Sequence, residues 1–204
     1  ESLGSFRDGL FYVQDPSTLL AVALLDPQPG QAMLDLCAAP GGKTCNIAGR
    51  MNNEGQLTAL DISEPRLEML RENCDRMHVT CATLGQADTA TTGGYDRVLV
   101  DVPCSNTGVM RRRLDLRWRL CPDETRLLTD EQLKLLGQAA ARTKPDGQLI
   151  YSTCSLEPEE NEQLVGRFLK ANPEWQLAEE RTLHPVEDHT DGAYAARLTR
   201  TTNN

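Results

Sequence analysis

Apolar residues in this chain fall into short continuous runs and into longer stretches at helical spacing, with Gly, Pro, Asn and Asp at the breaks. The short runs predict strands over residues 32–36, 55–60, 79–84, 95–102 and 148–152. The helical spacing predicts helices over residues 16–25, from after Gly42 to about Met51, and over residues 64–77, 123–143 and 157–171. The remaining C-terminal segment, including residues 193–199, is expected to supply two final strands.

Strands and helices alternate along most of the chain, which predicts an α/β fold with a mostly parallel sheet covered by helices on both faces. The run at 95–102 is apolar through most of its length, as expected of a strand buried on both faces. In such folds ligands bind at the carboxyl ends of the strands, so the residues that follow the strands are the candidates for chemistry.

The composition is that of one globular domain of ordinary size, since the chain has 204 residues. No apolar run reaches the roughly 18 residues of a membrane span, and the N-terminus lacks the pattern of a signal peptide. The seven cysteines are odd in number and form no C-x-x-C pair, which argues against a disulfide framework and against a zinc site. We therefore expect no metal and a location in the reducing cytoplasm.

The net charge of −9 argues against a nucleic-acid partner when taken alone, because phosphate binding usually requires a basic surface. The basic residues are clustered, however, in a short segment that also contains Trp118. This segment is a candidate RNA contact, and a solvated loop is the alternative. Its candidate RNA-binding residues are Arg111, Arg112, Arg113 and Arg117.

The segment 34–44 runs from a strand through small residues and glycines into a helix, which lets backbone amides approach a ligand closely. The Gly42-Lys43-Thr44 end suggests a P-loop, but Cys37 stands where that motif needs its first glycine. A G-x-G-x-x-G sequence is also lacking, which disfavours an NAD-dependent oxidoreductase.

Three further polar residues are candidates for binding an adenosine-type cofactor. Asp61 ends the next strand, 20 residues past Gly41, where a carboxylate can accept hydrogen bonds from ribose hydroxyls. Its alternative is a charge at a helix N-terminus. Arg66 lies one turn into the following helix and can contact the same cofactor or only solvent, and Asp88 can bind an adenine amine or be a plain loop residue.

Two segments place a cysteine directly after a buried strand, Cys104 after 95–102 and Cys154 after 148–152. One such cysteine alone is usually a small buried apolar residue, but two at one edge of the sheet indicate covalent chemistry. One covalent reaction that can use such a thiol is methyl transfer to cytosine, because a thiolate that adds to C6 makes C5 nucleophilic enough to take a methyl group. Asp101 is placed to protonate or hydrogen-bond N3, and a helix beginning near Glu157 is expected to lower the pKa of Cys154.

Residues 34–44, 101–108 and 152–162 together closely resemble the Sun/Fmu/NOP2-type RNA cytosine-5 methyltransferases. Residues 11–17 resemble the N-terminal catalytic motif of that family, and residues 191–198 resemble its last pair of strands. The resemblance implies a Rossmann-like class I methyltransferase fold with a seven-stranded sheet and S-adenosylmethionine as cofactor. It implies that Cys154 is the nucleophile and that Cys104 assists product release.

The resemblance also implies the cofactor contacts, the substrate and the domain organisation. The cofactor contacts are Cys37, Ala38, Ala39, Pro40, Gly41, Gly42, Lys43, Asp61, Arg66, Asp88 and Asp101. Ribosomal RNA is the first candidate substrate and tRNA the second. We expect residues 1–204 to form a monomeric catalytic domain, with the RNA-binding domain that such proteins usually carry lying outside this sequence.

Two residues depart from the family pattern. Asn106 stands where the family often has Gly, which is expected to alter the loop but not the chemistry, and Ala193 stands where an aromatic residue is common. Two alternative functions remain: a DNA cytosine-5 methyltransferase with Cys104 as nucleophile, and a binding module that has lost turnover. The pair Thr153-Cys154 favours RNA over DNA, and the presence of Asp101 with both cysteines favours an active enzyme.

Overall fold

The computed structural model describes residues 3–86, 94–118 and 122–201. Its strands are β1 (Ala32–Asp35), β2 (Gln56–Asp61), β3 (Ala82–Gln86), β4 (Tyr95–Asp101), β5 (Thr143–Thr153), β6 (Trp175–Leu183) and β7 (Ala193–Arg200). They form one seven-stranded sheet in the order β3-β2-β1-β4-β5-β7-β6. Strands β1 to β5 are parallel, and β7 is antiparallel to both of its neighbours. This confirms the fold class expected from the alternation of elements.

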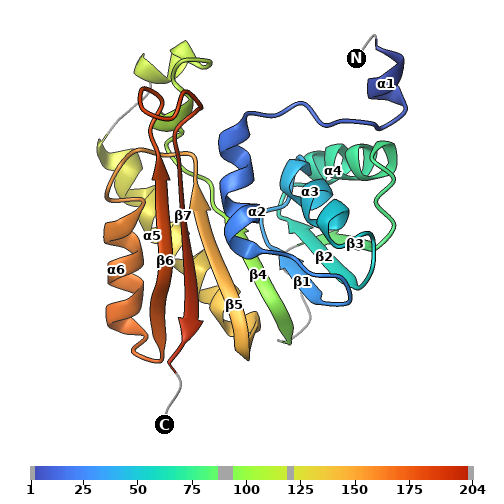
Figure 1. The fold of residues 1–204 in the computed structure, drawn as a ribbon. Coiled ribbons are helices and arrows are strands. Elements are labelled where there is room, and N and C mark those ends of the chain that lie inside the picture. Colours follow the sequence, from blue (N-terminus) through green and yellow to red (C-terminus); the bar gives the residue numbers. More distant parts are fainter. Residues whose placement is uncertain (1–2, 87–93, 119–121, 202–204) are drawn as a thin grey trace.

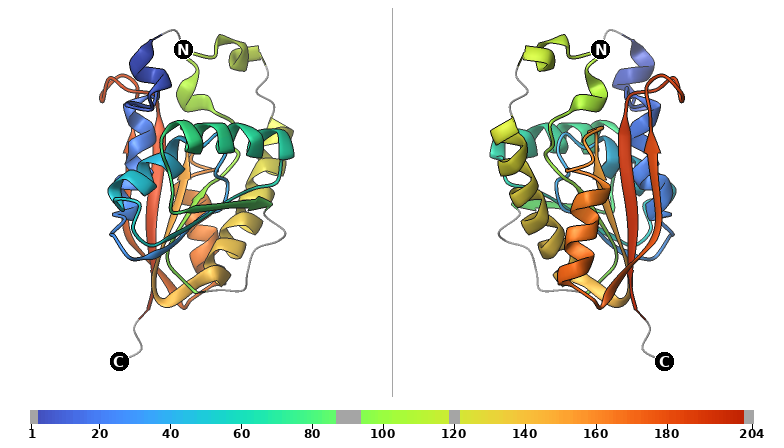
Figure 2. Two further views of the ribbon diagram at one scale, coloured as in Figure 1. Left: turned by 90° about the vertical axis from the view of Figure 1, so that its right-hand side faces the viewer. Right: turned by 90° about the vertical axis from the view of Figure 1, so that its left-hand side faces the viewer.

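Helices cover both faces of the sheet (Figures 1 and 2). The α-helices are α1 (Gly4–Arg7), α2 (Leu19–Leu25), α3 (Gly42–Arg50), α4 (Glu64–Arg76), α5 (Pro122–Arg142) and α6 (Glu162–Ala171). Short 3₁₀ turns, η1 (Pro16–Thr18), η3 (Thr107–Val109) and η4 (Leu114–Trp118), lie in the connections. Helices α2, α3 and α4 pack on one face, and α5 and α6 pack on the other. Among the described helices, none has the length and apolarity needed to span a membrane.

Alternation along the strands supplies a core to each layer. In β1, Met33 points into the cluster that contains Val22 of α2 and Ile47 of α3, whereas Leu34 points into the cluster that contains Leu136 of α5. Met33 and Leu34 are both fully buried. A central strand that is covered on both faces needs apolar residues at consecutive positions, and β1 and β4 have them.

The predicted helix at 157–171 begins five residues later than expected, at Glu162. Residues 155–161 form a turn instead, because their polar groups bind one another. The side chain of Asn161 donates to the carbonyl of Ser155 and accepts from the hydroxyl of Thr153, and the amide of Glu157 donates to Ser155 Oγ. Side chains that bind nearby backbone in this way compete with helix formation. The expectation that a helix N-terminus near Glu157 lies beside Cys154 is therefore wrong.

Strand β5 also differs from its prediction, since it begins at Thr143 rather than at residue 148. Thr143 pairs with Tyr95, and the register then shifts before Arg97 pairs with Gln148. The intervening Pro and Gly, which suggested a turn before the strand, lie within this irregularity. The carboxyl ends of β4 and β5 are unaffected, and Asp101 and Ser152 lie opposite each other there.

Candidate active site

A cavity of about 360 Å³ opens where the loops after β1, β2 and β4 meet α5. Its walls combine apolar and polar side chains, namely Leu36, Cys37, Asp61, Ile62, Arg66, Gln86, Pro103, Glu131, Leu135 and Gln138. A cavity of this size and mixed polarity suits a small ligand with an apolar ring and a few polar groups. It lies at the carboxyl edge of the sheet, where the fold predicts a binding site.

Asp61 and Arg66 bind the loop that follows β1. Asp61 is 2% exposed, and its two carboxylate oxygens accept from the amides of Ala39 and Ser63 at 3.2 and 3.1 Å. Arg66 donates to the carbonyl of Ala39 and lies 3.5 Å from Asp61. Arg66 therefore has a defined place beside the cavity instead of being only a solvated helix residue.

The glycines of the loop allow it to pack tightly. Gly41 has φ of +109°, and a Cβ there would come within 2.9 Å of the Leu70 side chain. A Cβ on Gly42 would come within 2.9 Å of the Gln14 side chain and 3.0 Å of the Tyr12 ring. The loop is thus held between α4 and the N-terminal segment, and α3 begins directly after it.

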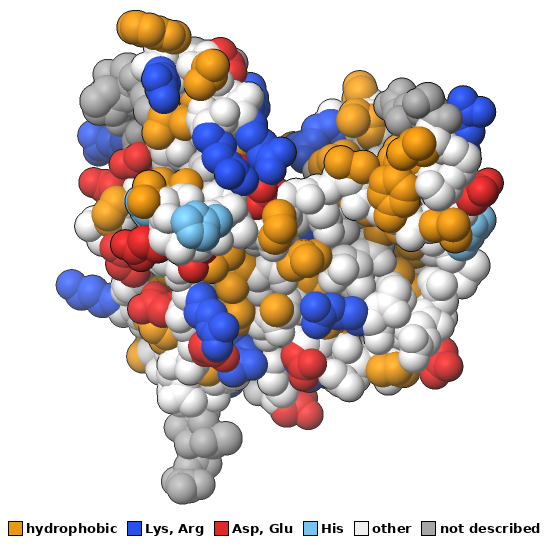
Figure 3. Space-filling view, turned by 45° about the horizontal axis from the view of Figure 1, so that its top comes forward, with side chains coloured by type: hydrophobic (Ala, Val, Ile, Leu, Met, Phe, Trp, Pro, Cys, Tyr) orange, Lys and Arg blue, Asp and Glu red, His pale blue; other side chains and the backbone are white. Residues whose placement is uncertain are grey.

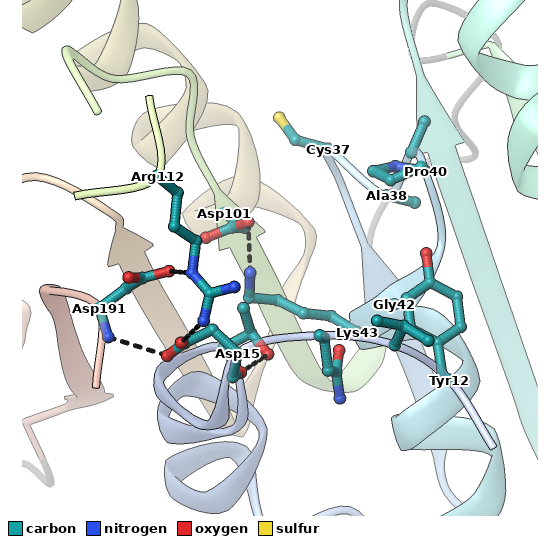
Figure 4. Close-up of a pocket in the computed structure, with 14 residues that line it drawn as sticks. Tyr12, Asp15, Cys37, Ala38, Pro40, Gly42, Lys43, Asp101, Arg112 and Asp191 are labelled. Carbon is teal, nitrogen blue, oxygen red and sulfur yellow. Dashed lines mark hydrogen bonds and ion pairs between the residues drawn. The ribbon is translucent and has the colours of Figure 1, made fainter. Parts of the chain in front are cut away.

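A second cavity of about 400 Å³ lies on the other side of this loop (Figure 4). Cys37, Ala38, Ala39, Pro40, Gly42 and Lys43 line it from the loop, and Tyr12, Val13, Gln14, Asp15, Thr18, Asp101, Arg112 and Asp191 complete its walls. Cys37 borders both cavities, so the two spaces lie on either side of one short segment. This geometry allows one ligand to lie next to another.

The ammonium of Lys43 points across the second cavity to Asp101 (Figure 4). Lys43 Nζ lies 2.6 Å from Asp101 Oδ2, while Ser152 Oγ donates to Asp101 Oδ1 at 2.6 Å. Burial works to lower the pKa of Lys43, but the charge and hydrogen bond of Asp101 outweigh it and raise that pKa. Lys43 is therefore charged, and its charge lies at the carboxyl ends of β4 and β5.

The structure brings the two predicted cysteines together. Cys104 follows β4 and Cys154 follows β5, and their sulfur atoms lie 3.3 Å apart. The cysteines are close because β4 and β5 are adjacent and parallel, and because each thiol follows its strand by only a few residues. Both thiols are free, as are the other described cysteines.

The two thiols have different acidities. The hydrogen bond from Cys104 lowers the pKa of Cys154, and the charge of Lys43 lowers it further, although burial opposes the shift. The same hydrogen bond, together with burial, raises the pKa of Cys104 well above its ordinary value. The directions of the two shifts make Cys154 the more acidic thiol of the pair.

Comparison with known proteins identifies the chain's family. The model of the family described as 16S rRNA methyltransferase RsmB/F matches residues 22–200. The chain is also 38% identical, over 209 residues, to ribosomal RNA small subunit methyltransferase B of Vibrio cholerae. The chain belongs to the RsmB/F family. The resemblance found in the motifs is thereby confirmed.

The RsmB/F relatives are longer than this chain. The match to the Vibrio cholerae protein covers 97% of the chain and 48% of the relative. The probable ribosomal RNA small subunit methyltransferase B of Bacillus subtilis is 36% identical over 177 residues, covering 84% of the chain and 40% of that protein. The chain thus spans half or less of the length of these curated relatives.

A solved structure supports the same family fold. NSun6 from Pyrococcus horikoshii, determined with SFG, matches the chain with a TM-score of 0.90 at 28% identity. The match covers 99% of this chain and 56% of that one. The chain therefore shares its fold with NSun6 along almost its whole length.

Glu160 is a site residue that the motifs did not reveal. Its carboxylate is fully buried and accepts from the backbone amide of Ser105 and from Gln132 Nε2, both at 2.9 Å. It also accepts from the hydroxyls of Ser105 and Ser155. Each serine directly follows one of the two cysteines. The repeated Cys-Ser pattern is the one feature of the sequence that could have indicated that the two loops share a hydrogen-bond partner.

The loop after β4 is also fixed to its neighbours at Gly108. The amide of Gly108 donates to the carbonyl of Cys154 at 3.0 Å, and its carbonyl accepts from the amide of Gly192 at 2.8 Å. A Cβ on Gly108 would lie 2.5 Å from the Gly192 oxygen and 2.7 Å from the Cys154 oxygen. Only glycine fits this contact, which connects the loops after β4, β5 and β6.

The predicted arginine patch divides into two parts. Arg111 and Arg112 form ion pairs with Asp15 and Asp191, whose side chains are 6% and 4% exposed. Hydrogen bonds from the amides of Asp191 and Ser17 lower the pKa of Asp15 against the opposing effect of burial. The two arginines and the two aspartates together carry no net charge.

The other arginines of the patch face outward. Arg113 lies 3.5 Å from the exposed Asp115, and Arg117 is exposed beside Trp118, which is 90% exposed. On the face of the molecule that Figure 3 shows, Lys and Arg side chains gather around the hollow between two raised parts. Asp88, the remaining predicted cofactor residue, lies outside the described residues.

Proposed function

We propose that this chain is a catalytic domain that methylates C5 of a cytosine in ribosomal RNA, with S-adenosylmethionine as methyl donor. The observation that carries the proposal is the 3.3 Å pair of thiols at the ends of β4 and β5, one of them made acidic by Lys43 and by its partner. Two adjacent cysteines of unequal acidity suit a reaction that needs a nucleophile first and a base afterwards.

The cavity between Cys37 and α5 fits the cofactor. Each oxygen of Asp61 accepts one backbone hydrogen bond, and because a carboxylate has roughly four acceptor positions, ribose hydroxyls can still bind it. Ile62, Pro103 and Leu135 offer apolar contacts to a base. Bound there, S-adenosylmethionine supplies an electrophilic methyl group on its sulfonium. Of the contacts that the resemblance implies, Cys37, Asp61 and Arg66 line this cavity, whereas Ala38, Ala39, Pro40, Gly42, Lys43 and Asp101 line the second cavity.

The first chemical role belongs to Cys154. Its thiolate adds to C6 of the cytosine, which forms an S–C6 bond and moves an electron pair toward C5. The Lys43–Asp101 pair lines the second cavity, where it can provide a hydrogen bond or a proton to N3. Transfer of the methyl group then leaves C5 with both the methyl group and its original proton.

The second role belongs to Cys104. Once Cys154 is a thioether it carries no charge, so the hydrogen bond that kept Cys104 protonated no longer favours that state. Cys104 can then lose its proton to solvent and take the proton from C5. Breakage of the S–C6 bond restores the aromatic ring, releases the Cys154 thiolate and returns any proton held at N3 to the Lys43–Asp101 pair.

The exposed arginines and the free thiols support the proposed RNA contact and the proposed location of the protein. Arg113 and Arg117 are the arginines placed to contact RNA phosphates, since Arg111 and Arg112 already pair with buried aspartates. A reaction that depends on two free thiols requires a reducing compartment, which supports a cytoplasmic location.

The test is transfer of radiolabelled methyl from S-adenosylmethionine to unmethylated 16S ribosomal RNA, tRNA and DNA by the natural full-length polypeptide. Label recovered as 5-methylcytosine in the ribosomal RNA is expected. Cys154→Ala should remove the label while cofactor affinity, measured by calorimetry, stays within about twofold, because Cys154 lines neither side of the proposed cofactor cavity. Label in DNA alone, or full turnover by Cys154→Ala, contradicts the proposal.

A further inference from the structure

The side chain of Asn106 contacts both of the cysteines to which we assign catalytic roles. Its Nδ2 donates to the carbonyl oxygen of Cys104 at 2.7 Å, and its Oδ1 accepts from the Cys154 thiol at 3.0 Å. The backbone of Asn106 has φ of +60°, in the left-handed region that glycine and asparagine adopt most readily. The asparagine side chain thus reaches the Cys154 thiol from this loop. A glycine at the same position would have no side chain to make this contact.

The orientation of this amide is set by its other partner. A backbone carbonyl can only accept, so the carbonyl of Cys104 requires the NH₂ group of Asn106 on its side. The amide oxygen is then left facing Cys154. An oxygen acceptor stabilises a neutral S–H group but not a thiolate, which needs donors or positive charge.

We infer that Asn106 is a positioning residue that holds Cys154 as a neutral thiol in the RNA-free protein. Deprotonation of Cys154 removes the S–H···O hydrogen bond and leaves the amide oxygen facing a negative sulfur. The nucleophile is therefore fully activated only when the Asn106 side chain turns away from it. Asn106 acts on the chemistry of the site, and not only on the shape of the loop.

The other groups around Cys154 act in both directions. From α3, Lys43 favours the thiolate, while Asp101 at the end of β4 disfavours it. Cys104, in the loop after β4, lies 3.3 Å from the sulfur and favours the thiolate when it donates its hydrogen bond to Cys154. Glu160, in the turn before α6, acts on Cys104. Removal of the Asn106 amide leaves all four in place, so a change on its removal reports on the amide.

The test is the pH dependence of Cys154 alkylation by iodoacetamide, measured in the full-length protein without RNA or cofactor. Trypsin separates the two thiols, since Cys104 lies in residues 98–111 and Cys154 in residues 143–167, and mass spectrometry follows each peptide. In N106G the midpoint for Cys154 is expected to fall by about one pH unit, the size of one lost hydrogen bond to the neutral form. In N106D the midpoint should rise, because a carboxylate faces the sulfur.

A matched control is available in the same chain. Asn52 is exposed and has φ of +54°, so N52G makes the same change in the same backbone region at a distance from the site. Its Cys154 midpoint should equal that of the wild type. An unchanged midpoint in N106G, or the same direction of shift in N106G and N106D, overturns the inference.

The inference rests on the role proposed for Cys154, but the two can fail separately. Alkylation requires only an accessible thiol, so an N106G shift in a protein that never methylates RNA would support the contact and contradict the proposed function. Methylation by a protein whose N106G midpoint is unchanged would do the opposite.

Discussion

Cys104 and Cys154 occupy similar places, each followed by a serine and each just beyond a buried strand, yet the structure makes them unequal. Lys43 acts on Cys154, whereas Glu160 acts on Cys104. The order of the motifs along the chain predicted that both thiols lie at one edge of the sheet. Their different roles depend on which sulfur has a positively charged side chain near it and which has a negatively charged one. Neither the periodicity of the sequence nor the spacing of the motifs determines this.

Removal of Cys104 is expected to trap the reaction after methyl transfer. Cys104→Ala should accumulate a covalent RNA–protein adduct, because the base that takes the C5 proton is missing while the Cys154 nucleophile remains. Denaturing gels of reactions with labelled RNA measure the slow-migrating species. The double variant Cys104→Ala/Cys154→Ala should give none, and a Cys104→Ala reaction that turns over without adduct would refute the release role.

Lys43 is expected to contribute to the pH range in which Cys154 reacts. The hydrogen bond from Cys104 is the largest influence that lowers the pKa of Cys154, and the charge of Lys43 lowers that pKa further. Lys43→Met should therefore shift the alkylation midpoint of Cys154 to higher pH by about one unit. Lys43→Arg keeps the charge and should shift it much less. Equal midpoints in the methionine variant and the wild type would exclude Lys43 as the cause.

At the scale of elements, the carboxyl ends of the central strands were predictable and the starts of β3, β5 and α6 were not. Apolar runs ended within one residue of the ends of β1, β2 and β4, because burial on both faces imposes a continuous apolar pattern. The start of α6 was placed too early because Glu160 and Asn161 look like helix residues in sequence. They are instead bound by serine and threonine side chains that lie near in space.

The buried carboxylate of Glu160 is expected to hold the two cysteine loops to α5. Glu160→Ala would leave the amide of Ser105 and one of the two N–H groups of Gln132 Nε2 without an acceptor, which should cost about 3 kcal/mol of unfolding free energy. Urea denaturation followed by circular dichroism measures this loss. The neighbouring Glu159→Ala is the control, because Glu159 is exposed and should change stability by less than about 0.5 kcal/mol. Similar losses in both variants would contradict the role given to Glu160.

At the scale of the whole molecule, the sheet order brings together segments that are far apart in sequence. The alternation of elements predicted a mostly parallel sheet and the family resemblance implied its seven strands, but neither predicted that Asp15, Arg112 and Asp191 meet beside the second cavity. The arginine run in the sequence looked like a uniform RNA contact. Two of its members are instead neutralised by buried aspartates, which a local pattern cannot reveal because the partners are 96 and 80 residues away from Arg111.

The division of the arginine patch leads to a prediction about RNA binding by a chain whose net charge is −9. Arg113→Ala/Arg117→Ala should weaken binding to 16S ribosomal RNA fragments and reduce the slope of log affinity against log salt by about 2, since each arginine releases roughly one counterion. Thermal stability should stay unchanged, because both side chains are exposed.

The control for that experiment removes the same charge from the opposite edge of the sheet. Arg50 ends α3 and Arg142 ends α5, away from the carboxyl ends of the strands, so Arg50→Ala/Arg142→Ala changes the net charge equally. If RNA binding depended on net charge alone, both double variants would lose affinity to the same extent. A larger loss and a smaller salt slope in the Arg113 and Arg117 variant alone would locate the RNA on the face that holds the two cysteines. Equal losses of affinity in the two double variants would show that Arg113 and Arg117 do not contact the RNA.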